Sequence, residues 1–298
     1  MSKKSNINFI GIGAQKSGTS WLFRQFSKSN QIDLPPIKEL HYFDRSKEYP
    51  SPNFLSQTKL SSRLINIKWT AQALSKIKKN KENRGWYNKW FFSNFTDDWY
   101  LSLFSEFENC KGEITPAYAI LKEEDVAKMS KLLGRDTKII FMLRHPVDRA
   151  WSSYKFMNKI TEYSTDDFEN AKAYMQSDYQ VLRSQYLKTI QLYKSYFNSI
   201  FIGFFDAVVE QPDELLWEIF KYLELNTSEV KKFKNLKKKV NTSKRISIPA
   251  EIKDMLEEMY TDEIHQLSSL YGGYFNKWKN PSQFDQQETN FKPGIIIK

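Results

Sequence analysis

The segment FIGIGAQKSGTSWLFRQF, residues Phe9–Phe26, decides the fold that this sequence predicts. It has the order of a phosphate-binding loop: a short apolar run, a glycine-bearing turn with a lysine and hydroxyls, and then a helical pattern. Loops of nucleoside triphosphatases read G-x-x-x-x-G-K-[ST], with the lysine directly after the second glycine. Gly13 and Gly18 keep that glycine spacing. Thr19 follows Gly18, however, and the lysine, Lys16, comes two residues earlier, so we expect a phosphate-like group other than the end of ATP.

The residue types in this turn suit an anion. A strand that ends in a glycine-rich turn and opens a helix presents backbone N–H groups and the positive end of the helix dipole. Lys16 adds a mobile positive charge, while Ser17, Thr19 and Ser20 add hydroxyl donors. We therefore predict a phosphate or sulfate cradle. The alternative is an ordinary glycine-containing turn between a strand and a helix.

Three short, nearly continuous apolar runs predict strands, at Asn8–Ala14, Thr137–Leu143 and Ser199–Phe205. Runs of this kind are typical of parallel strands that are covered on both faces. Helical patterns lie between and after them. This alternation predicts an α/β fold with an open, mainly parallel central sheet flanked by helices.

The length and composition fit one large folded domain. The chain has 298 residues, of which 40% are hydrophobic and 15% aromatic, enough to bury a large core in one large α/β domain or in two small ones. Because no convincing linker divides it, we predict a single domain over residues 1–298. Its core would span residues 6–278, and the polar, proline-bearing stretch 279–298 would form a surface tail.

The sequence also bears on the compartment. No apolar run reaches the roughly 18 residues that suggest a membrane span. Residues 1–13 have a charged start but only a very short apolar stretch, which does not fit a signal peptide. The single cysteine, Cys110, cannot form an internal disulfide. We therefore expect a soluble, cytoplasmic protein.

The formal net charge of +10 has two readings. Lysine-rich segments such as 76–83 and 231–239 are either solvated surfaces or part of a field that attracts a polyanion. Nucleic acid is one such polyanion, but we find no zinc-ligand spacing, basic zipper or RNA-recognition aromatic signature. We therefore expect no nucleic-acid partner.

A second informative stretch is KIIFMLRHPVDRAWSSYKF, Lys138–Phe156. Arg144 follows a predicted strand, at the end where ligands of open α/β sheets bind. Pro146 suits the first position of the next helix, and Asp148 suits its first turn. Ser152 then lies within that helix, close enough to share an anion with Arg144. Two such anion sites predict a nucleotide with two separated phosphates; the alternative is that Arg144 merely pairs with a local acid.

Together, GIGAQKSGTSWL (11–22) and FMLRHPVDRAWSSY (141–154) resemble the two nucleotide motifs of sulfotransferases that use 3′-phosphoadenosine 5′-phosphosulfate (PAPS). The resemblance implies a P-loop-like sulfotransferase fold. It also implies that Arg144 and Ser152 bind the 3′-phosphate and that Lys16 meets the bridging oxygen between the phosphate and the sulfuryl group. The first motif would supply the 5′-phosphosulfate contacts Gln15, Lys16, Ser17, Gly18, Thr19 and Ser20.

The resemblance extends over most of the chain. PPIKELHYFD (35–44) resembles the Lys-Glu-x-His-Phe-Phe-Asp segment of the glycan sulfotransferase branch, and GEITPAYA (112–119) and SQYLKTIQLYKSYF (184–197) also follow family patterns. NTSKRISIP (241–249) is similar to the basic loop that closes over the 3′-phosphate. That loop would add the nucleotide contacts Ser243, Lys244 and Arg245.

Glu39 is the predicted base. Two prolines exclude a continuing helix before it, so residues 38–44 are expected to start extended, with Glu39, His41 and Phe43 on one face. Sulfuryl transfer to an alcohol or amine needs a base for the acceptor's proton, and a carboxylate within hydrogen-bond reach can serve. The resemblance assigns this role to Glu39, with His41 as the alternative base or an orienting partner. A surface Glu beside a core-facing His is the remaining alternative.

The expected reaction is in-line transfer of the sulfuryl group from PAPS, which leaves the desulfated nucleotide PAP. Lys16 would neutralise the charge that develops on the leaving phosphate. We expect no metal requirement, because the three histidines, His41, His145 and His265, are dispersed and form no metal-ligand spacing.

The acceptor is less defined. The aromatic residues between positions 45 and 110 either line a cleft for a sugar or a lipid-like alcohol, or form a core beneath a long excursion. A small molecule, a glycolipid headgroup or a carbohydrate is the expected acceptor. The aromatic residues concerned are Trp69, Trp86, Tyr87, Trp90, Phe91, Phe92, Trp99 and Tyr100.

Two other function classes stay open. A P-loop kinase that phosphorylates a small molecule would share the fold logic, but it would need a divalent metal, and this sequence has no lysine after Gly18. A non-enzymatic nucleic-acid binder would bind with a steep dependence on salt.

Overall fold

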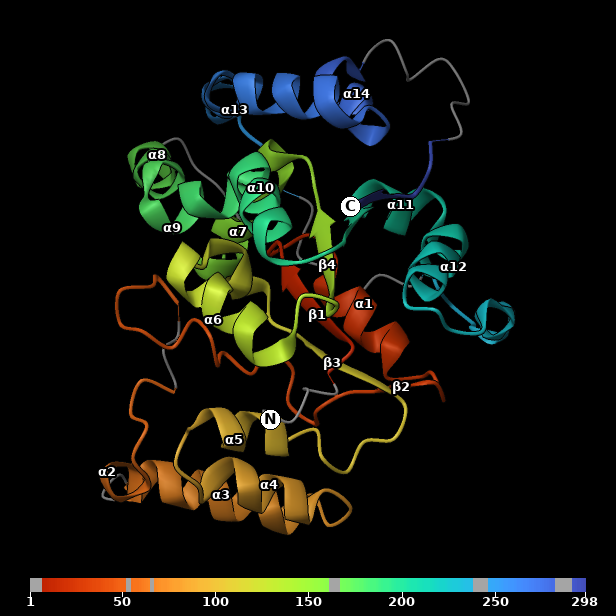
Figure 1. The fold of residues 1–298 in the computed structure, drawn as a ribbon. Coiled ribbons are helices and arrows are strands. Elements are labelled where there is room, and N and C mark those ends of the chain that lie inside the picture. The colour runs from red at the N-terminus through yellow and green to blue at the C-terminus, as the bar shows by residue number, and fades with distance from the viewer. Residues whose placement is uncertain (1–6, 52–54, 65–66, 161–166, 238–245, 282–290) are drawn as a thin grey trace.

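A six-stranded sheet forms the centre of the computed structural model, which describes residues 7–51, 55–64, 67–160, 167–237, 246–281 and 291–298 (Figure 1). The strands lie in the order β2-β3-β1-β4-β5-β6, and every neighbouring pair except β5 with β6 is parallel. The fold is therefore the α/β architecture that the sequence predicts. The strands are β1 (Phe9–Gly13), β2 (Ile32–Asp33), β3 (Cys110–Ile114), β4 (Lys138–Leu143), β5 (Ile200–Phe204) and β6 (Gly294–Ile297).

Strand β1 lies in the middle of the sheet and leads into the glycine-bearing turn. All its residues are buried, as expected for a continuous apolar run that helices cover on both faces. It pairs with β3, where Phe9 lies opposite Gly112, and with β4, where Phe9 lies opposite Lys138. The three strands predicted from apolar runs, β1, β4 and β5, are confirmed.

The carboxyl-terminal prediction is wrong for residues 294–297. They form β6, which pairs antiparallel with β5, with Ile297 opposite Ile200 and Ile295 opposite Ile202. The surface-tail prediction followed from the polar residues and the proline that dominate the stretch. Three consecutive isoleucines outweigh them locally, because β-branched residues suit a strand and the edge of β5 offers unpaired backbone groups.

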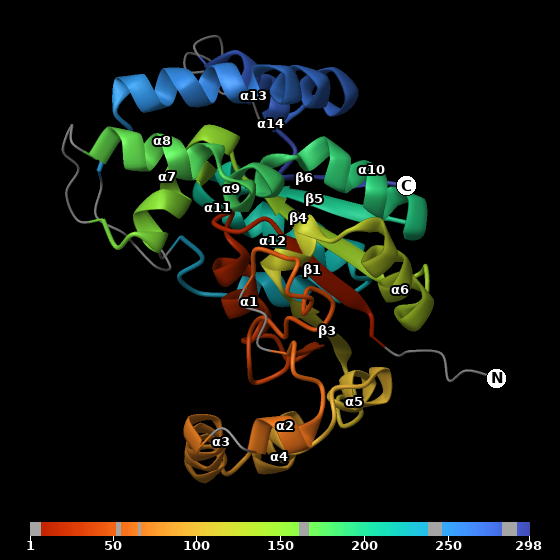
Figure 2. The ribbon, with the colours of Figure 1, turned by 90° about the vertical axis from the view of Figure 1, so that its left-hand side faces the viewer.

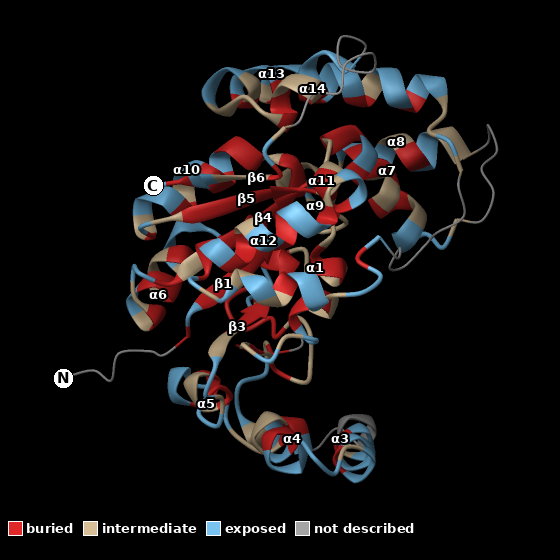
Figure 3. Cartoon of the chain, turned by 90° about the vertical axis from the view of Figure 1, so that its right-hand side faces the viewer, coloured by how far each residue is buried: buried red, intermediate tan, exposed pale blue. Residues whose placement is uncertain are grey.

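Helices cover both faces of the sheet (Figure 1). Helices α1 (Thr19–Phe26) and α12 (Pro212–Tyr222) lie on one face, where the rings of Phe26 and Phe220 meet with centroids 6.4 Å apart. Helices α6 (Glu123–Leu133) and α10 (Tyr186–Tyr196) pack together on the other. Figure 3 shows the strands buried between these layers, whereas the helices turn one side to solvent.

The remaining helices extend this core. Helix α7 (Pro146–Met157), which follows β4, packs against the long helix α13 (Ala250–Tyr271) at the top of Figure 1. The other elements are α8 (Phe168–Gln176), α9 (Asp178–Val181), α11 (Phe205–Glu210), α14 (Tyr274–Lys279) and the 3₁₀ helices η1 (Pro116–Ile120), η3 (Leu182–Ser184) and η4 (Thr227–Lys232).

A group of helices between β2 and β3 extends away from the sheet, to the bottom of Figures 1 and 2, and Tyr100 joins it to β3 through its hydrogen bond to Glu113. They are α2 (Leu60–Leu64), α3 (Ile67–Lys79), α4 (Arg84–Phe91) and α5 (Asp97–Ser102).

The aromatic residues of this group form a core. Trp86 and Trp90 stack with centroids 5.4 Å apart, and Phe95 lies 4.4 Å from Trp99. The side chain of Trp69 lies outside the part of the chain that the structure describes. For the remaining aromatic residues of the segment, the burial of the side chains favours a core over an open acceptor cleft. Five of them are buried, namely Trp86, Tyr87, Phe91, Trp99 and Tyr100, and Trp90 and Phe92 are partly buried.

Candidate active site

The turn after β1 is held tightly against the sheet. Lys16 and Gly18 have left-handed backbone conformations, with φ of 69° and 90°. Glycine suits that φ, and a Cβ at Gly18 would lie only 3.2 Å from the ring of Phe205. The amide of Ala14 donates a hydrogen bond to the carbonyl of Met142 in β4 at 2.6 Å. The backbone of the turn is therefore fixed before any ligand binds.

Helix α1 begins in this turn with an open N-terminus. Gly18 is its N-cap, and no described side chain makes a capping hydrogen bond to it. The first N–H groups of the helix therefore lack intrahelical partners, and the helix dipole places partial positive charge beside them. Ser17 and Thr19 are buried there and Ser20 is partly buried. This set of donors suits a phosphate or a sulfate.

Four cationic side chains gather at the turn. Burial lowers the pKa of Lys16, and the charges of Arg144, Lys155 and Lys38 lower it further. The Lys16 ammonium lies 4.0 Å from the centre of the Phe156 ring. Because these positive charges disfavour one another, an anion bound at the turn would relieve their repulsion.

Arg144 follows β4, as predicted, and its guanidinium lies 4.6 Å above the ring of Phe205. Its nearest acid among the described residues is Asp148, at 4.0 Å. The Nε atom of Arg144 is buried and has no hydrogen-bond partner in the described part of the chain. A buried, unpaired donor is costly, and a bound anion would satisfy it.

Ser152 lies on α7, one helical turn before Lys155. The charge of Arg144 contributes to lowering the pKa of Lys155, after burial, which places Lys155 near the same site. Trp151 and Lys155 both donate hydrogen bonds to the carbonyl of Ile246, at 2.9 and 3.2 Å. The predicted nucleotide contacts Ser243, Lys244 and Arg245 lie just before Ile246, outside the described residues.

Gln15 has a different environment from its neighbours in the first motif. Its Oε1 accepts a hydrogen bond from the Tyr179 hydroxyl at 3.0 Å. That hydrogen bond joins the turn to α9, and nothing in the sequence of α9 predicted a contact with the turn. The structure thus brings Lys16, Arg144 and the open end of α1 together, and it places Gln15 at the edge of the group.

The second half of the site is the loop over residues 38–44. Nδ1 of His41 lies 2.7 Å from an Asp44 carboxylate oxygen, and Nε2 lies 3.6 Å from Glu39. Glu39 also forms an ion pair with Lys38. His41 therefore lies between two carboxylates.

These contacts determine the charge states in the loop. Burial would lower the pKa of His41, but its hydrogen bonds to Asp44 and Glu39 outweigh burial and raise it to about 9. Burial would raise the pKa of Glu39, but the hydrogen bond from His41 and the charge of Lys38 lower it to about 2. Near neutral pH, Glu39 is a carboxylate and His41 is an imidazolium.

The expectation that this loop starts extended is wrong. Glu39 and His41 have φ of 67° and 54°, in the left-handed region. Non-glycine residues enter that region only where surrounding contacts compensate. The two side chains still meet, but through a folded backbone held by tertiary hydrogen bonds rather than through the alternation of a strand.

Three charged residues of the site were not identified from the sequence. Asp44 and Lys38 flank the predicted pair, and Lys155 follows Ser152. The sequence contained the spacing that could have identified two of them. Asp44 lies three residues after His41 in the KELHYFD segment, and Lys155 lies three residues after Ser152 on one predicted helix.

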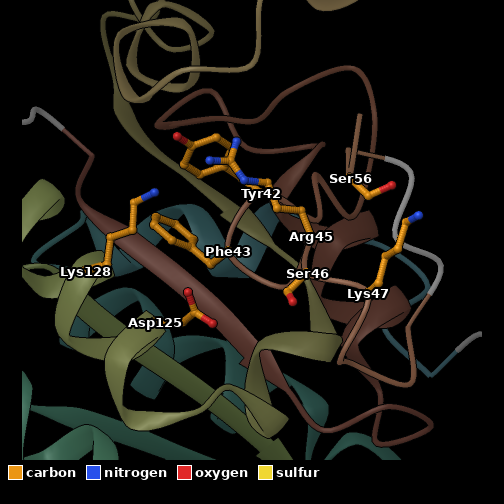
Figure 4. A pocket seen from close by; sticks show the side chains of 8 residues that line it. All are labelled: Tyr42, Phe43, Arg45, Ser46, Lys47, Ser56, Asp125 and Lys128. Atoms are coloured by element: carbon orange, nitrogen blue, oxygen red, sulfur yellow. The ribbon is translucent and has the colours of Figure 1, made fainter. Parts of the chain in front are cut away.

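A hollow of about 390 Å³ opens beside this loop, between Tyr42 and helix α6 (Figure 4). Arg45 lies over the Tyr42 ring, with Cζ 4.6 Å from its centroid. Lys128 pairs with Asp97 at 3.3 Å. The lining residues are Tyr42, Phe43, Arg45, Ser46, Lys47, Ser56, Asp125 and Lys128.

Two further properties concern the described residues. No group of three or more His, Cys, Asp or Glu side chains within them is arranged to hold a metal ion. None of their helices is both long enough and apolar enough to cross a membrane.

A family model described as "Sulfotransferase domain" matches residues 7–291. This chain belongs to the sulfotransferase family. The sulfotransferase also resembles solved structures. A sulfotransferase from Alicyclobacillus acidocaldarius aligns with a TM-score of 0.61 at 19% identity, over 94% of this chain and 100% of that one.

The sulfotransferase domain of the Synechococcus PCC 7002 olefin synthase aligns with a TM-score of 0.51 at 15% identity, over 87% of this chain and 95% of that one. At such identities these structures show the sulfotransferase fold alone. No match is found among curated protein sequences.

Proposed function

We propose that this sulfotransferase takes the sulfuryl group from PAPS and transfers it to a hydroxyl or amine of a small-molecule, glycolipid or carbohydrate acceptor. The observation that carries the proposal is the position of Lys38. Its charge acts on Lys16 in the turn, and its ammonium pairs with Glu39 in the loop. Lys38 thus links the proposed anion donors of the turn to a carboxylate that could take a proton, which supports the proposal because transfer of a charged group to an alcohol needs both.

The residues around the turn fit a nucleotide with two separated anionic groups. The open end of α1 and Lys16 would hold the phosphosulfate, and Arg144 with Ser152 would hold the 3′-phosphate. The buried Nε of Arg144, which has no hydrogen-bond partner among the described residues, supports this fit. When bound, PAPS would supply the sulfuryl group. Lys16 would stabilise the negative charge left on the phosphate oxygen.

Electrostatics favours Glu39 over His41 as the base. With a pKa of about 9, His41 is protonated near neutral pH and cannot accept another proton, whereas Glu39 is ionised. A pKa of about 2 makes Glu39 a weak base while the hydrogen bond from His41 and the ion pair with Lys38 stabilise its carboxylate. We expect Lys38 to shift toward the nucleotide's negative groups, which would raise the pKa of Glu39. His41, held by Asp44, would orient the carboxylate.

The acceptor side is supported by the hollow beside the loop (Figure 4). Its lining provides hydroxyl and cationic donors, including Ser46, Ser56 and Lys128, which suit a hydroxyl-rich acceptor. The aromatic residues of α4 and α5 are mostly buried and offer no equivalent apolar surface.

A ligand screen tests the proposal. Thermal unfolding would be measured with PAP, with ATP plus magnesium, and with a single-stranded oligonucleotide, because a ligand of the native state raises the apparent stability. We expect the largest increase in Tm with PAP. A larger increase with ATP plus magnesium would favour the kinase alternative. A salt-sensitive increase with the oligonucleotide would favour nucleic-acid binding.

Catalysis would then be tested directly. The wild-type enzyme would be incubated with PAPS and a panel of alcohols, amines and sugars, and the release of PAP would be followed. PAP release that depends on an acceptor supports the transferase. Binding of PAP without turnover of any acceptor would leave a nucleotide-binding protein and contradict the proposed reaction.

A further inference from the structure

We propose that Glu113, on strand β3, is a positioning residue for the reaction: its carboxylate orients two hydroxyl groups that hold the backbone on both sides of His41. The proposal rests on the proposed function for its kinetic consequence, but its structural content can be measured independently. Glu113 is 1% exposed and belongs to neither the turn nor the loop.

The Glu113 carboxylate accepts hydrogen bonds from three hydroxyls. The Thr115 hydroxyl donates to Oε2 at 2.6 Å, and the hydroxyls of Tyr118 and Tyr100 donate to Oε1 at 3.0 and 2.7 Å. The Leu40 amide lies 3.3 Å from Oε2. Among the described residues no cation pairs with this carboxylate. Burial raises the pKa of Glu113, and the hydrogen bonds from the hydroxyl and amide donors offset that rise in part by stabilising the ionised form.

Two of these hydroxyls also accept hydrogen bonds from the loop. The Leu40 amide donates to the Thr115 hydroxyl oxygen at 2.9 Å, and the Tyr42 amide donates to that of Tyr118 at 2.9 Å. A hydroxyl has one proton, and an ionised carboxylate only accepts. Because Glu113 takes both protons, the oxygen lone pairs of Thr115 and Tyr118 turn toward the loop.

The hydrogen bonds to Thr115 and Tyr118 hold the part of the loop whose backbone is strained. The two amides flank His41, and Glu39 immediately precedes Leu40. Glu39 and His41 both have positive φ, a conformation that persists only when surrounding contacts determine it. The hydroxyl relay from Glu113 fixes the backbone between them, and so fixes how the imidazole meets the Glu39 carboxylate.

The third hydroxyl differs from the other two. Tyr100 lies on α5 and donates to Glu113, but no hydrogen bond joins its hydroxyl to the loop backbone in the described residues. Tyr100 and Tyr118 therefore form a matched pair. Each Tyr→Phe change removes one hydrogen bond to the same buried carboxylate, and only the change at Tyr118 also removes an acceptor from the loop.

The first test is Glu113→Gln. An amide donates as well as accepts, so the hydroxyl that faces the new NH2 group can no longer donate there, and its orientation toward the loop amide is no longer fixed. We expect kcat to fall about tenfold or more, because small displacements of reacting groups reduce rates strongly, while the Kd of PAP stays near that of wild type. Glu108→Gln, an exposed change on the loop before β3, is the control. Unchanged kcat would overturn the proposal.

The imidazole of His41 gives a second readout that does not depend on turnover. The chain has three histidines, so the C2-proton signal of His41 can be assigned with His145→Gln and His265→Gln variants. In wild type we expect a pKa of about 9. In Glu113→Gln we expect it to move down toward the ordinary histidine value, because the loop no longer holds His41 between its two carboxylates.

The matched pair keeps the proposal testable if Glu113→Gln fails to fold. We expect Tyr118→Phe to lower both kcat and the pKa of His41, and Tyr100→Phe to lower Tm while leaving both unchanged. Equal effects of the two changes on kcat and on the His41 pKa would show that Glu113 is merely structural. If wild type transfers no sulfuryl group, the proposed function fails, but the His41 titration still decides the role of Glu113.

Discussion

The turn after β1 and the loop over residues 38–44 lie next to each other, but their electrostatics are opposite. In the turn, Lys16 lies among cations whose charges, with burial, lower its pKa. In the loop, His41 lies between two carboxylates that raise its pKa to about 9. The cations at the turn repel one another until an anion binds, whereas in the loop the charges of Lys38 and His41 are balanced by those of Glu39 and Asp44. A bound nucleotide should therefore stabilise the turn directly, but it must compete with existing ion pairs in the loop.

The largest expected effect comes from the turn. Lys16→Ala should lower transfer by roughly a hundredfold to a thousandfold, because the leaving phosphate loses its charge partner. The ligand-free protein should be as stable as wild type or more so, because one member of a repelling group is gone. Turnover and thermal unfolding without ligand would be measured together. Lys131→Ala, a change at an exposed residue of α6, is the control. Near-normal turnover of Lys16→Ala would contradict the role of Lys16 in stabilising the leaving phosphate.

The ion pairs of His41 with Glu39 and Asp44 should make the free energy of unfolding depend on pH. The folded pKa of His41, about 9, lies above its ordinary value of 6.5, so its stabilisation is fully present below about pH 6.5 and is lost as pH rises through 9. The rise in the pKa of His41 corresponds to a stabilisation on the order of 3 kcal/mol. Urea unfolding of wild type and His41→Gln would be compared at about pH 6 and pH 10. A difference between them that does not shrink with rising pH would contradict the ion network.

Glu39→Gln separates chemistry from binding. It keeps the shape of the side chain but removes the charge that takes the proton, so transfer should fall by about a hundredfold. The affinity for PAP should stay near wild type. Calorimetry with PAP and a turnover assay would use one preparation, with Glu124→Gln as an exposed control. Normal turnover would exclude Glu39 as the base, and lost PAP binding would make its carboxylate structural.

The smallest effect should come from the second anion site. Replacing Arg144 or Ser152 by alanine should weaken PAP by roughly tenfold, the cost of about one charge-assisted hydrogen bond. Adenosine 5′-phosphosulfate, which lacks the 3′-phosphate, should be affected less. The two affinities would be measured by calorimetry on each variant. Equal losses for both nucleotides would indicate a folding defect or another role.

The turn could be predicted from the sequence because its features are local. An apolar run, two glycines and a cluster of donors follow one another within residues 9–26, and the structure places them as a strand, a turn and an open helix end. Strands β2 and β3 were not predicted. Strand β2 has two residues, and β3 contains Lys111 and Glu113, whose polarity hides a strand unless the tertiary partners of Glu113 are known.

The geometry of the loop could not be predicted for the same reason. Its residue types indicated an acid and an imidazole together, and the structure brings Glu39 and His41 to 3.6 Å. The positive φ of both residues depends on hydroxyls of Thr115 and Tyr118, more than 70 positions away in the chain. The residues next to Glu39 and His41 in the sequence do not indicate which distant hydroxyls will bind the loop backbone.

The central position of β1 has a consequence for how the protein folds. Phe9 pairs with Gly112 on one side and with Lys138 on the other, so β1 can pair only after segments more than 100 positions later in the chain have been synthesised. Closing such long loops costs entropy before the contacts form, which slows folding. Until then β1 is an apolar segment with both edges unpaired, and we expect incomplete chains to associate through it. Synthesis at low temperature, which slows association of the unpaired chains, should therefore raise the yield of folded protein.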